Sequence, residues 1–330
     1  MKTNNNTDIA FASCIQKVFL KLERDHKLST YKNYKYSLSV FYKYIDMLSN
    51  GKDWVVSPHL FSEEILQGFV KWMREQRQAT SCNTVLANIR GLLKRIQTED
   101  PTFVAIYLGS EEVEKMKEEK REVLPLNENE IRKILEATDL KSPMGIRYNA
   151  MFSLIVTSGL RISEALSIRM KDITLDGARS HIRIIGKGKK PRDVPISVTM
   201  IPILTNYMVY FHLSFDMPEA YLFFSTRTGF YRMASRSGAH IQLKHYAKKA
   251  LGEDGKSVHL HQLRHTAATS WLENGVILPD ISKILGHSSL HVTKRYAKVS
   301  MKMKDAAMKE NQTPQKQPRE KENILDFLSL

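Results

Sequence analysis

Cysteine and long apolar runs are both scarce in this chain of 330 residues. The two cysteines, Cys14 and Cys82, have no CxxC neighbour, so we expect no disulfide framework and a reducing cytoplasm. No stretch approaches the roughly 20 apolar residues that a membrane span needs. The polar start Met1–Asn6 leads into no secretory signal. The sequence therefore predicts a cytoplasmic protein with no membrane partner.

Acidic residues are outnumbered as well. The chain has 50 Lys and Arg against 35 Asp and Glu, a net charge of +15 and a pI near 9.6. Such a surplus favours a polyanionic partner, because Lys and Arg release counterions from a phosphate backbone. Net charge alone does not separate DNA from RNA or anionic lipid. The hydrophobic share of 42% is normal for a globular protein, and the length suits two domains with separate cores.

The first third of the chain is predicted to be helical, because apolar residues recur at helical spacing from about residue 10 to residue 108. We expect helices to be capped by Ser29 or Thr30, by Ser62 and by Ser81. Basic residues lie among the apolar ones: Lys32, Lys35, Lys43, Arg90, Lys94 and Arg95. They form either a merely solvated face or a grip on the DNA backbone.

A charged run, Glu111–Glu122, is predicted to link two domains. We expect a helical domain over 1–110, a linker over 111–124, a second domain over 125–310 and a flexible tail over 311–330. The tail ends in the apolar segment Ile324–Leu330. This segment suits docking in a groove of a neighbouring copy, and the alternative is that it folds back on its own domain.

Helices of the second domain have clear start and stop signals. Asn127 and Glu130 form a capping-box pattern, and Pro143 begins the next helix. Gly159 suits the left-handed cap at the end of that helix. Further helices are expected from Val258 and over Leu278–Leu285, the latter closed by Gly286.

Strand signals cluster in one place, at 173–175, 181–185 and 192–196, with a turn at 186–190. Pro191 and Pro195 suit an edge strand. The stretch Thr226–Ser237 is interpreted as a loop. The predicted fold class is therefore mainly α with a small antiparallel β-sheet, as a helical domain followed by an α+β domain.

Six residues make up the candidate catalytic site: Arg161, Lys187, His261, Arg264, His287 and Tyr296. Cleavage of a phosphodiester needs a nucleophile, neutralisation of the phosphorane charge and a proton donor for the departing oxygen. Tyrosine can be the nucleophile, two arginines can neutralise the charge without a metal, and lysine or histidine can move protons. Taken singly, each residue also fits a structural role; the ordered combination favours the chemistry.

Two other motif readings fail. The turn Gly186–Lys190 lacks the long glycine-spaced loop and the Lys-Ser/Thr ending of a P-loop. His261 and His265 share a helix face that could suit zinc, but the metalloprotease glutamate is absent and Arg264 places a cation there. We expect no cofactor and no metal.

These motifs resemble those of the tyrosine recombinase family, also called the phage integrase family. The family's places are filled in order by Arg161 in Gly-Leu-Arg-Ile-Ser-Glu, Lys187 in Ile-Gly-Lys-Gly, His261 and Arg264 in His-Gln-Leu-Arg-His, His287 in Leu-Gly-His and Tyr296 in Arg-Tyr-Ala. His287 follows Arg264 by 23 residues, and Tyr296 follows His287 by 9. The resemblance covers the second domain, and the helical first domain looks like the family's core-binding domain.

The resemblance implies a role for each residue. Tyr296 would attack the scissile phosphate and form a 3′-phosphotyrosine, while Arg161 and Arg264 would clamp the phosphate. Lys187 would protonate the 5′-hydroxyl as it leaves, with Lys189 as a rival in the same turn.

Further roles follow from the same resemblance. His261 would assist proton transfer at the tyrosine, His287 would bind the phosphate, and Glu164 would support the site without reacting. The implied enzyme is a simple two-domain site-specific recombinase that integrates or excises a mobile element, with chromosome-dimer resolution or DNA inversion as alternatives. Its implied partners are a double-stranded DNA site, a homotetramer with exchanged tails and accessory DNA-bending proteins. The rivals are a type IB topoisomerase and a non-catalytic DNA-binding regulator.

Overall fold

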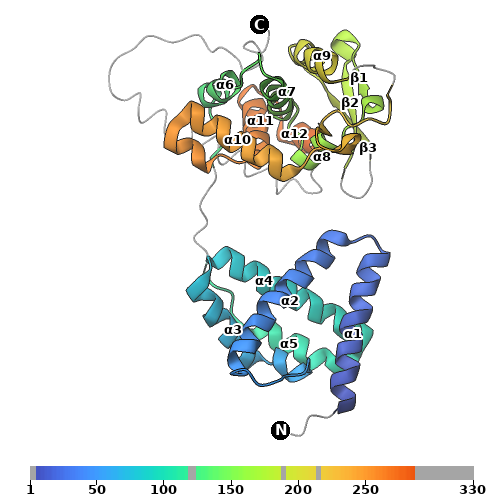
Figure 1. The fold of residues 1–330 in the computed structure, drawn as a ribbon, viewed down its shortest axis with the longest axis vertical. Coiled ribbons are helices and arrows are strands. Elements are labelled where there is room, and N and C mark those ends of the chain that lie inside the picture. The colour runs from blue at the N-terminus through green and yellow to red at the C-terminus, as the bar shows by residue number, and fades with distance from the viewer. Residues whose placement is uncertain (1–4, 118–123, 187–190, 213–216, 287–330) are drawn as a thin grey trace. The chain divides into compact units, whose positions relative to one another are not determined.

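The computed structural model describes residues 5–117, 124–186, 191–212 and 217–286. Its contacts divide the chain into two compact units, Met1–Arg121 and Glu122–Leu330, each with its own apolar core (Figure 1). The described residues are mostly helical with two small antiparallel sheets, which confirms the predicted fold class. Among the described helices, none combines the length and apolar character that crossing a membrane requires.

The first unit is a helical bundle centred on α4. Because α4 packs against each of the other long helices, it carries much of the core, including Leu86, Ile89 and Leu93. Aromatic rings fill the space beside it, with the ring centroid of Phe41 at 4.8 Å from Phe61 and 5.0 Å from Phe69. The helices are α1 (Asn5–Arg24), α2 (Leu28–Leu48), α3 (Glu63–Gln76), α4 (Ala79–Glu99) and α5 (Val104–Glu112), with 3-10 turns at Pro58–Phe61 and Pro101–Phe103.

Helix starts in this unit follow the predicted caps only in part. Ser62 caps α3 as predicted, its side chain accepting from the main-chain N–H of Ile65. The predicted caps of α2, at Ser29 or Thr30, and of α4, at Ser81, were wrong. The chain turns at His26, with a φ of 52°, and α2 resumes at once from Leu28 without a side-chain cap. In α4, Ala79 is a strong helix former, so the helix begins there, before Ser81.

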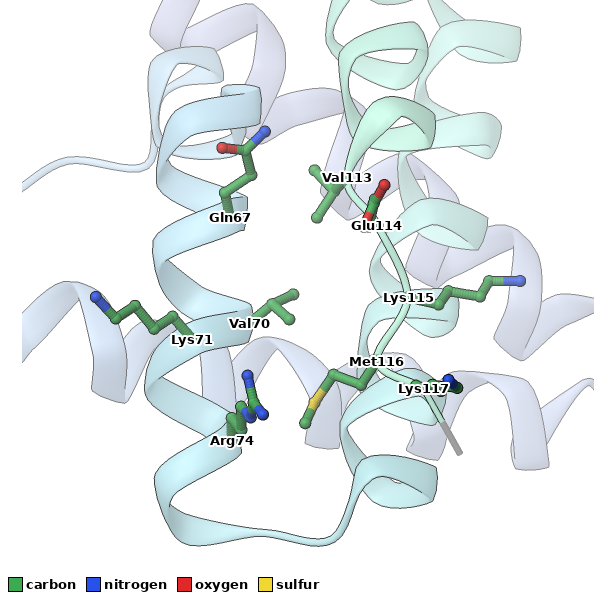
Figure 2. Close-up of a pocket in the computed structure, with 9 residues that line it drawn as sticks. All are labelled: Gln67, Val70, Lys71, Arg74, Val113, Glu114, Lys115, Met116 and Lys117. Carbon is green, nitrogen blue, oxygen red and sulfur yellow. The ribbon is translucent and has the colours of Figure 1, made fainter. Parts of the chain in front are cut away.

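A short strap, residues 113–117, follows α5 and packs on the first unit. Val113 lies in the core, and Asn83 of α4 exchanges two hydrogen bonds with the main chain of Met116, at 2.8 and 2.9 Å. The strap and α3 line a groove of about 580 Å³, into which Val70 and Met116 point (Figure 2). Residues 111–117, which the sequence assigns to the linker, therefore pack with the first unit. The other domain boundaries stay predictions.

The prediction for Arg90, either a solvated face or a contact with the DNA backbone, was wrong, because its side chain is buried. Its Nε donates to the carbonyl of Ser110 at 2.7 Å, and its Nη2 donates to the carbonyls of Glu111 and Val113. These carbonyls lie at the end of α5, where a helix leaves its acceptors unsatisfied. Arg90 therefore stabilises the helix end and the strap and is not available to DNA. The remaining predicted basic residues are exposed: Lys32, Lys35, Lys43, Lys94 and Arg95.

The second unit is built around α7, which is buried along most of its length. It packs against α6, α8, α9, α10 and α11 (Figure 1). The predicted capping box of α6 is confirmed, with Asn127 and Glu130 bonded in both directions at 2.7 and 2.9 Å, and α7 begins at Pro143 as predicted. The helices are α6 (Glu128–Glu136), α7 (Pro143–Ser158), α8 (Ile162–Ser167), α9 (Met200–Phe211), α10 (Arg236–Leu251), α11 (Leu260–Glu273) and α12 (Leu278–Leu285), with 3-10 turns at Met170–Asp172, Gly177–Arg179 and Gly252–Ser257.

The predicted antiparallel sheet has the order β1 (Ile173–Thr174), β2 (His181–Ile185) and β3 (Pro191–Pro195). The prolines of β3 lie on an edge strand, as predicted, and Val194 pairs with Ile182 on the buried face. The interpretation of 226–237 as a loop was wrong, because β4 (Phe224–Ser225) pairs there with β5 (Gly229–Met233). Gly229 turns the chain with a φ of 89°, and the rings of Phe224 and Phe230 pack 4.4 Å apart between centroids.

Candidate active site

Gly159 fixes the main chain that leads to Arg161. It ends α7 in the predicted left-handed conformation, with a φ of 63°. A Cβ atom at this position would lie 2.7 Å from Cδ2 of Leu285 and 2.8 Å from Cη2 of Trp271, so α11 and α12 leave room for glycine alone. After the buried Leu160, Arg161 is the N-cap residue of α8. The turn therefore holds Arg161 beside the end of α12, where its Nη1 donates to the carbonyl of Leu285.

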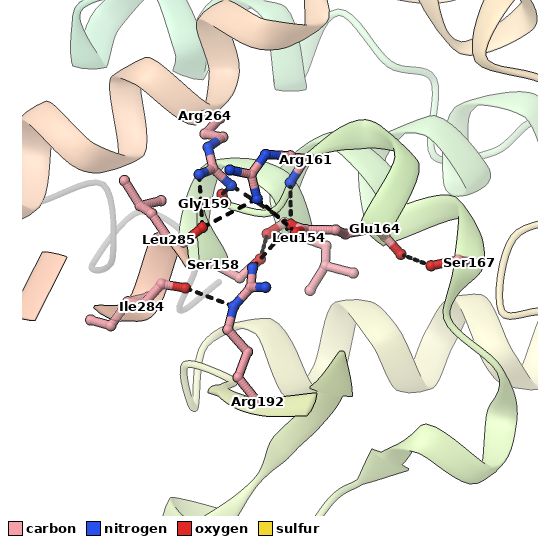
Figure 3. A network of polar contacts seen from close by, with 10 residues as sticks. All are labelled: Leu154, Ser158, Gly159, Arg161, Glu164, Ser167, Arg192, Arg264, Ile284 and Leu285. Carbon is pink, nitrogen blue, oxygen red and sulfur yellow. Dashed lines mark hydrogen bonds and ion pairs between the residues drawn. The ribbon is translucent and has the colours of Figure 1, made fainter. Parts of the chain in front are cut away.

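In the part of the chain that the structure describes, the carboxylate of Glu164 is bound by three arginines (Figure 3). Arg161 donates from Nη1 to Oε1 and from its main-chain N–H to Oε2, both at 2.9 Å. Arg192 of β3 donates from Nη2 to Oε2 at 3.0 Å, and Nη1 of Arg264 lies 3.6 Å from the same oxygen. Only 7% of the Glu164 side chain is exposed.

The charge of Glu164 is set by two opposed effects. Burial by itself raises the pKa of Glu164, but hydrogen bonds from Arg192 and Arg161 outweigh it and hold the pKa below its ordinary value. The carboxylate is therefore ionised at neutral pH. Because three guanidinium groups surround one carboxylate, the cluster keeps an excess of positive charge, which suits an anion such as a phosphate.

The same arginines hold the end of α12. The carbonyl of Leu285 accepts from Nη2 of Arg264 at 2.8 Å and from Nη1 of Arg161 at 3.3 Å. Arg192 donates from Nε to the carbonyl of Ile284 at 3.0 Å. These bonds satisfy carbonyls that lack a partner within the helix. As predicted, α12 is closed by Gly286, which has a φ of 63°.

The two predicted phosphate-binding arginines differ in accessibility. The Arg264 side chain is 1% exposed, and its Nη1 also donates to the carbonyl of Gly159 at 3.0 Å. The Arg161 side chain is 34% exposed. Arg161 is therefore the more accessible of the two predicted phosphate-binding arginines.

The remaining predicted residues are placed only in part. His261 is exposed in the first turn of α11, and its ring meets the buried ring of His265 edge-on, with centroids 4.7 Å apart. Within the described ranges, no group of three His, Cys, Asp or Glu side chains could hold a metal. Lys187, its rival Lys189, His287 and Tyr296 lie outside the described residues.

Arg192 is the member of this cluster that the sequence interpretation missed, because the motif of this hairpin is defined by a lysine of the preceding turn. One signal could have found it. Side chains alternate between the two faces of a strand, so Arg192 shares a face with Val194. Val194 is buried, and an arginine on the buried face of a strand needs an acidic or carbonyl partner.

Residues 125–303 match the model described as the phage integrase family. This chain belongs to the phage integrase family. Tyrosine recombinase XerD of Listeria monocytogenes serotype 4b (strain F2365) is 28% identical over 303 residues, which cover 87% of this chain and 94% of the relative. Tyrosine recombinase XerC of Chlamydia caviae is 31% identical over 258 residues, 76% of this chain and 78% of the relative. The predicted enzyme class, a site-specific tyrosine recombinase, is confirmed.

Solved structures agree with this integrase-family fold. The recombinase XerH, bound to its palindromic difH substrate after cleavage, superposes with a TM-score of 0.65 at 21% identity, covering 89% of this chain and 83% of XerH. A fragment of lambda integrase, a dimer bound to a core site, has a TM-score of 0.62 at 15% identity, covering 84% and 95%. At these identities the likeness shows the fold.

Proposed function

We propose that this recombinase cleaves and rejoins a specific DNA site through a 3′-phosphotyrosine on Tyr296. The observation that carries the proposal is the cluster at Glu164, where Arg161 and Arg264 are brought together from distant parts of the sequence. Both arginines also bind the end of α12. Tyr296, the tyrosine of the family motif, follows a short distance after this helix end in the sequence.

Cleavage then proceeds by in-line displacement. The phenolic oxygen of Tyr296 bonds to the scissile phosphorus as its proton leaves with the assistance of His261, and the bond to the 5′-oxygen breaks. Lys187 donates a proton to that oxygen, giving a free 5′-hydroxyl. Arg161 and Arg264 neutralise the charge on the non-bridging oxygens.

Rejoining is the reverse reaction. A 5′-hydroxyl attacks the phosphotyrosine, reforms the phosphodiester and returns the proton to the phenol. Because the ester keeps the energy of the original bond, strand exchange needs no nucleotide triphosphate. His287 is assigned to phosphate binding in both directions.

The proposed substrate is double-stranded DNA. A net charge of +15 and the exposed Lys32, Lys35 and Lys43 on α2 support backbone contacts by the first unit. The related lambda integrase forms a tetramer on a Holliday junction. We extend this to a tetramer of the present chain, with Ile324–Leu330 docked on a neighbouring subunit and with DNA-bending proteins assisting assembly. That segment lies outside the described residues.

Two biological uses of this chemistry have support. Integration or excision of a mobile element is our first proposal, and the Tn1549 transposon integrase shares the fold with a TM-score of 0.61. Resolution of chromosome dimers is the second candidate, which the similarity to Xer recombinases favours. The sequence at which the protein becomes attached separates them: an element end indicates the first, and a single chromosomal locus away from any element indicates the second.

The test is covalent capture. The purified full chain is incubated with genomic DNA of its host, denatured with detergent, and the attached DNA is sequenced. We expect adducts at one or a few sequences with the wild type and with the control Tyr231→Phe, whose tyrosine is exposed on β5. Tyr296→Phe should bind DNA but form no adduct.

Each rival predicts another result. Adducts spread over unrelated sequences, with relaxation of any supercoiled plasmid, would favour a topoisomerase. DNA binding by the wild type without adducts would favour a regulator. Adducts that persist in Tyr296→Phe would overturn the assignment of the nucleophile.

A further inference from the structure

We infer that Arg192 is a positioning residue of this recombinase: it holds Glu164 and the end of α12 in place so that Arg161 is correctly presented to the scissile phosphate. The inference rests on the proposed function and adds a residue to it. No motif used in the sequence interpretation includes Arg192.

The contacts of Arg192 join three elements (Figure 3). From β3 its Nη2 donates to Glu164 on α8, and its Nε donates to the carbonyl of Ile284 on α12, both at 3.0 Å. A Cβ atom at Gly286 would lie 3.0 Å from Nη1, so the chain passes directly over the guanidinium. Arginine suits this place because its planar fork presents several donors in fixed directions.

Arg192 acts on Arg161 through their shared carboxylate. Oε2 of Glu164 accepts from Arg192 and from the main-chain N–H of Arg161, while Oε1 accepts from the Arg161 guanidinium. Without Arg192 the carboxylate loses a charged donor and becomes free to rotate towards other partners. The Arg161 guanidinium then loses a fixed acceptor, although none of its own atoms has been changed.

The exposed fraction of the Arg192 side chain favours a positioning role over direct contact with DNA. The Arg192 side chain is 17% exposed, half the value of Arg161, and two of its three nitrogens bind protein acceptors. A side chain that is so little exposed supports the phosphate-binding Arg161 without itself contacting the phosphate. Its loss should therefore change the cleavage rate and leave the affinity for DNA unchanged.

The ionisation of Glu164 gives a second readout. Within the described residues, the charged groups that face this carboxylate are Arg161 on α8, Arg192 on β3 and Arg264 on α11. The hydrogen bond from Arg192 is the strongest influence that lowers the pKa of Glu164 against burial. When it is removed the pKa rises, so Glu164 becomes protonated at a higher pH. The acid limb of the cleavage profile should shift to higher pH in Arg192→Gln.

The test compares two duplex substrates built on the site found by covalent capture. One has the ordinary scissile phosphodiester, and the other has a methylphosphonate, which carries no charge on its non-bridging oxygen and depends less on the arginines. Arg192→Gln should slow adduct formation on the phosphodiester by about tenfold to a hundredfold, the scale of a small misplacement, and on the methylphosphonate by clearly less. Arg192→Lys should be intermediate.

The matched control is Arg183→Gln on the adjacent strand β2. Arg183 is exposed and pairs with Asp193 at 3.1 Å, away from Glu164. It should behave as the wild type on both substrates. Half-site affinity and the midpoint of thermal unfolding are measured for every variant.

Four outcomes would overturn the inference. Wild-type cleavage by Arg192→Gln would show that the residue does not position Arg161. Equal losses on both substrates would assign it to stability alone, and weaker binding with a smaller salt dependence would make it a direct DNA contact. If Arg192→Gln does not fold, the same comparison is made with Arg192→Lys, and equal losses there also overturn it. A wild type that forms no adduct on either substrate overturns the proposed function itself, a result distinct from the others.

Discussion

The carbonyl oxygen of Leu285 accepts a hydrogen bond from Nη2 of Arg264 over 2.8 Å. The bond ties α11 to the last residue of α12, and Arg161 donates to the same oxygen. The proposed phosphate-binding arginines thus hold the helix end after which His287 and Tyr296 follow in the sequence. In the proposed mechanism, the side chains that bind the phosphate therefore also fix the start of the segment that carries the nucleophile.

Gly159 provides a test of this packing. Gly159→Ala should lower the free energy of unfolding by about 3 kcal/mol, because positive φ costs roughly 1–2 kcal/mol and the overpacked Cβ adds to it. Gly177 has a φ of 49° with no neighbouring atom within 4 Å of a Cβ, so Gly177→Ala should cost about 1 kcal/mol. Urea unfolding measures both variants. Equal losses would contradict the close approach of Leu285 and Trp271.

Glu164 should make stability depend on pH. Its folded-state pKa lies below the ordinary value of 4.5, so its contribution is present above about pH 4.5 and is lost as the pH falls through the folded-state pKa. In Glu164→Gln this titration is gone, and at pH 7 the variant should be less stable by about 3 kcal/mol, since buried arginines lose their counter-charge. Unfolding free energies measured from about pH 7 down to about pH 3 should show the two curves beginning to converge below about pH 4.5. Parallel curves would contradict the assignment.

Substitutions at Arg90 and at Lys43 should affect different properties: the first the stability, the second the salt dependence of DNA binding. Arg90→Met leaves the carbonyls at the end of α5 unsatisfied and should destabilise the protein by about 2–3 kcal/mol, with no change in the salt dependence of DNA binding. Lys43→Met removes an exposed charge, so it should reduce the salt slope by about 1 and leave stability nearly unchanged. Thermal unfolding and salt-dependent binding isotherms measure both. A smaller salt slope in Arg90→Met would restore it as a DNA contact.

The apolar end of the chain tests assembly. Deleting Ile324–Leu330 should weaken formation of the tetramer on paired sites and spare binding to one half-site, as resolved on native gels. Replacing the polar Gln315, Lys316 and Gln317 by serine is the matched control and should have no effect. Full recombination by the truncated protein would rule out docking on a neighbour.

Local signals predicted the parts of the fold that depend on neighbouring residues. The Asn127 capping box, the Gly159 cap and the strand 181–185 follow from residues within one turn or one strand. The β4–β5 pair was missed because it depends on the packing of Phe224 against Phe230 across a glycine turn. The start of α4 was missed because several cap-type residues compete with a strong helix former.

The candidate site likewise has residues that local sequence motifs predicted and residues that they did not. Ordered motifs predicted Arg161 and Arg264, which the structure brings to one carboxylate. The contacts of Arg192 in the site, and those of Arg90 in the first unit, were not predicted. Each side chain binds groups distant in the sequence, and no local pattern marks such contacts. The catalytic roles of all six candidate residues, Arg161, Lys187, His261, Arg264, His287 and Tyr296, stay predictions.

The most direct test of the phosphotyrosine mechanism is to identify the residue that carries DNA in the denatured adduct. After nuclease and protease digestion, mass spectrometry should find a nucleotide joined through its 3′-phosphate to Tyr296. The same mass on another tyrosine, or on a serine or histidine, would contradict the mechanism.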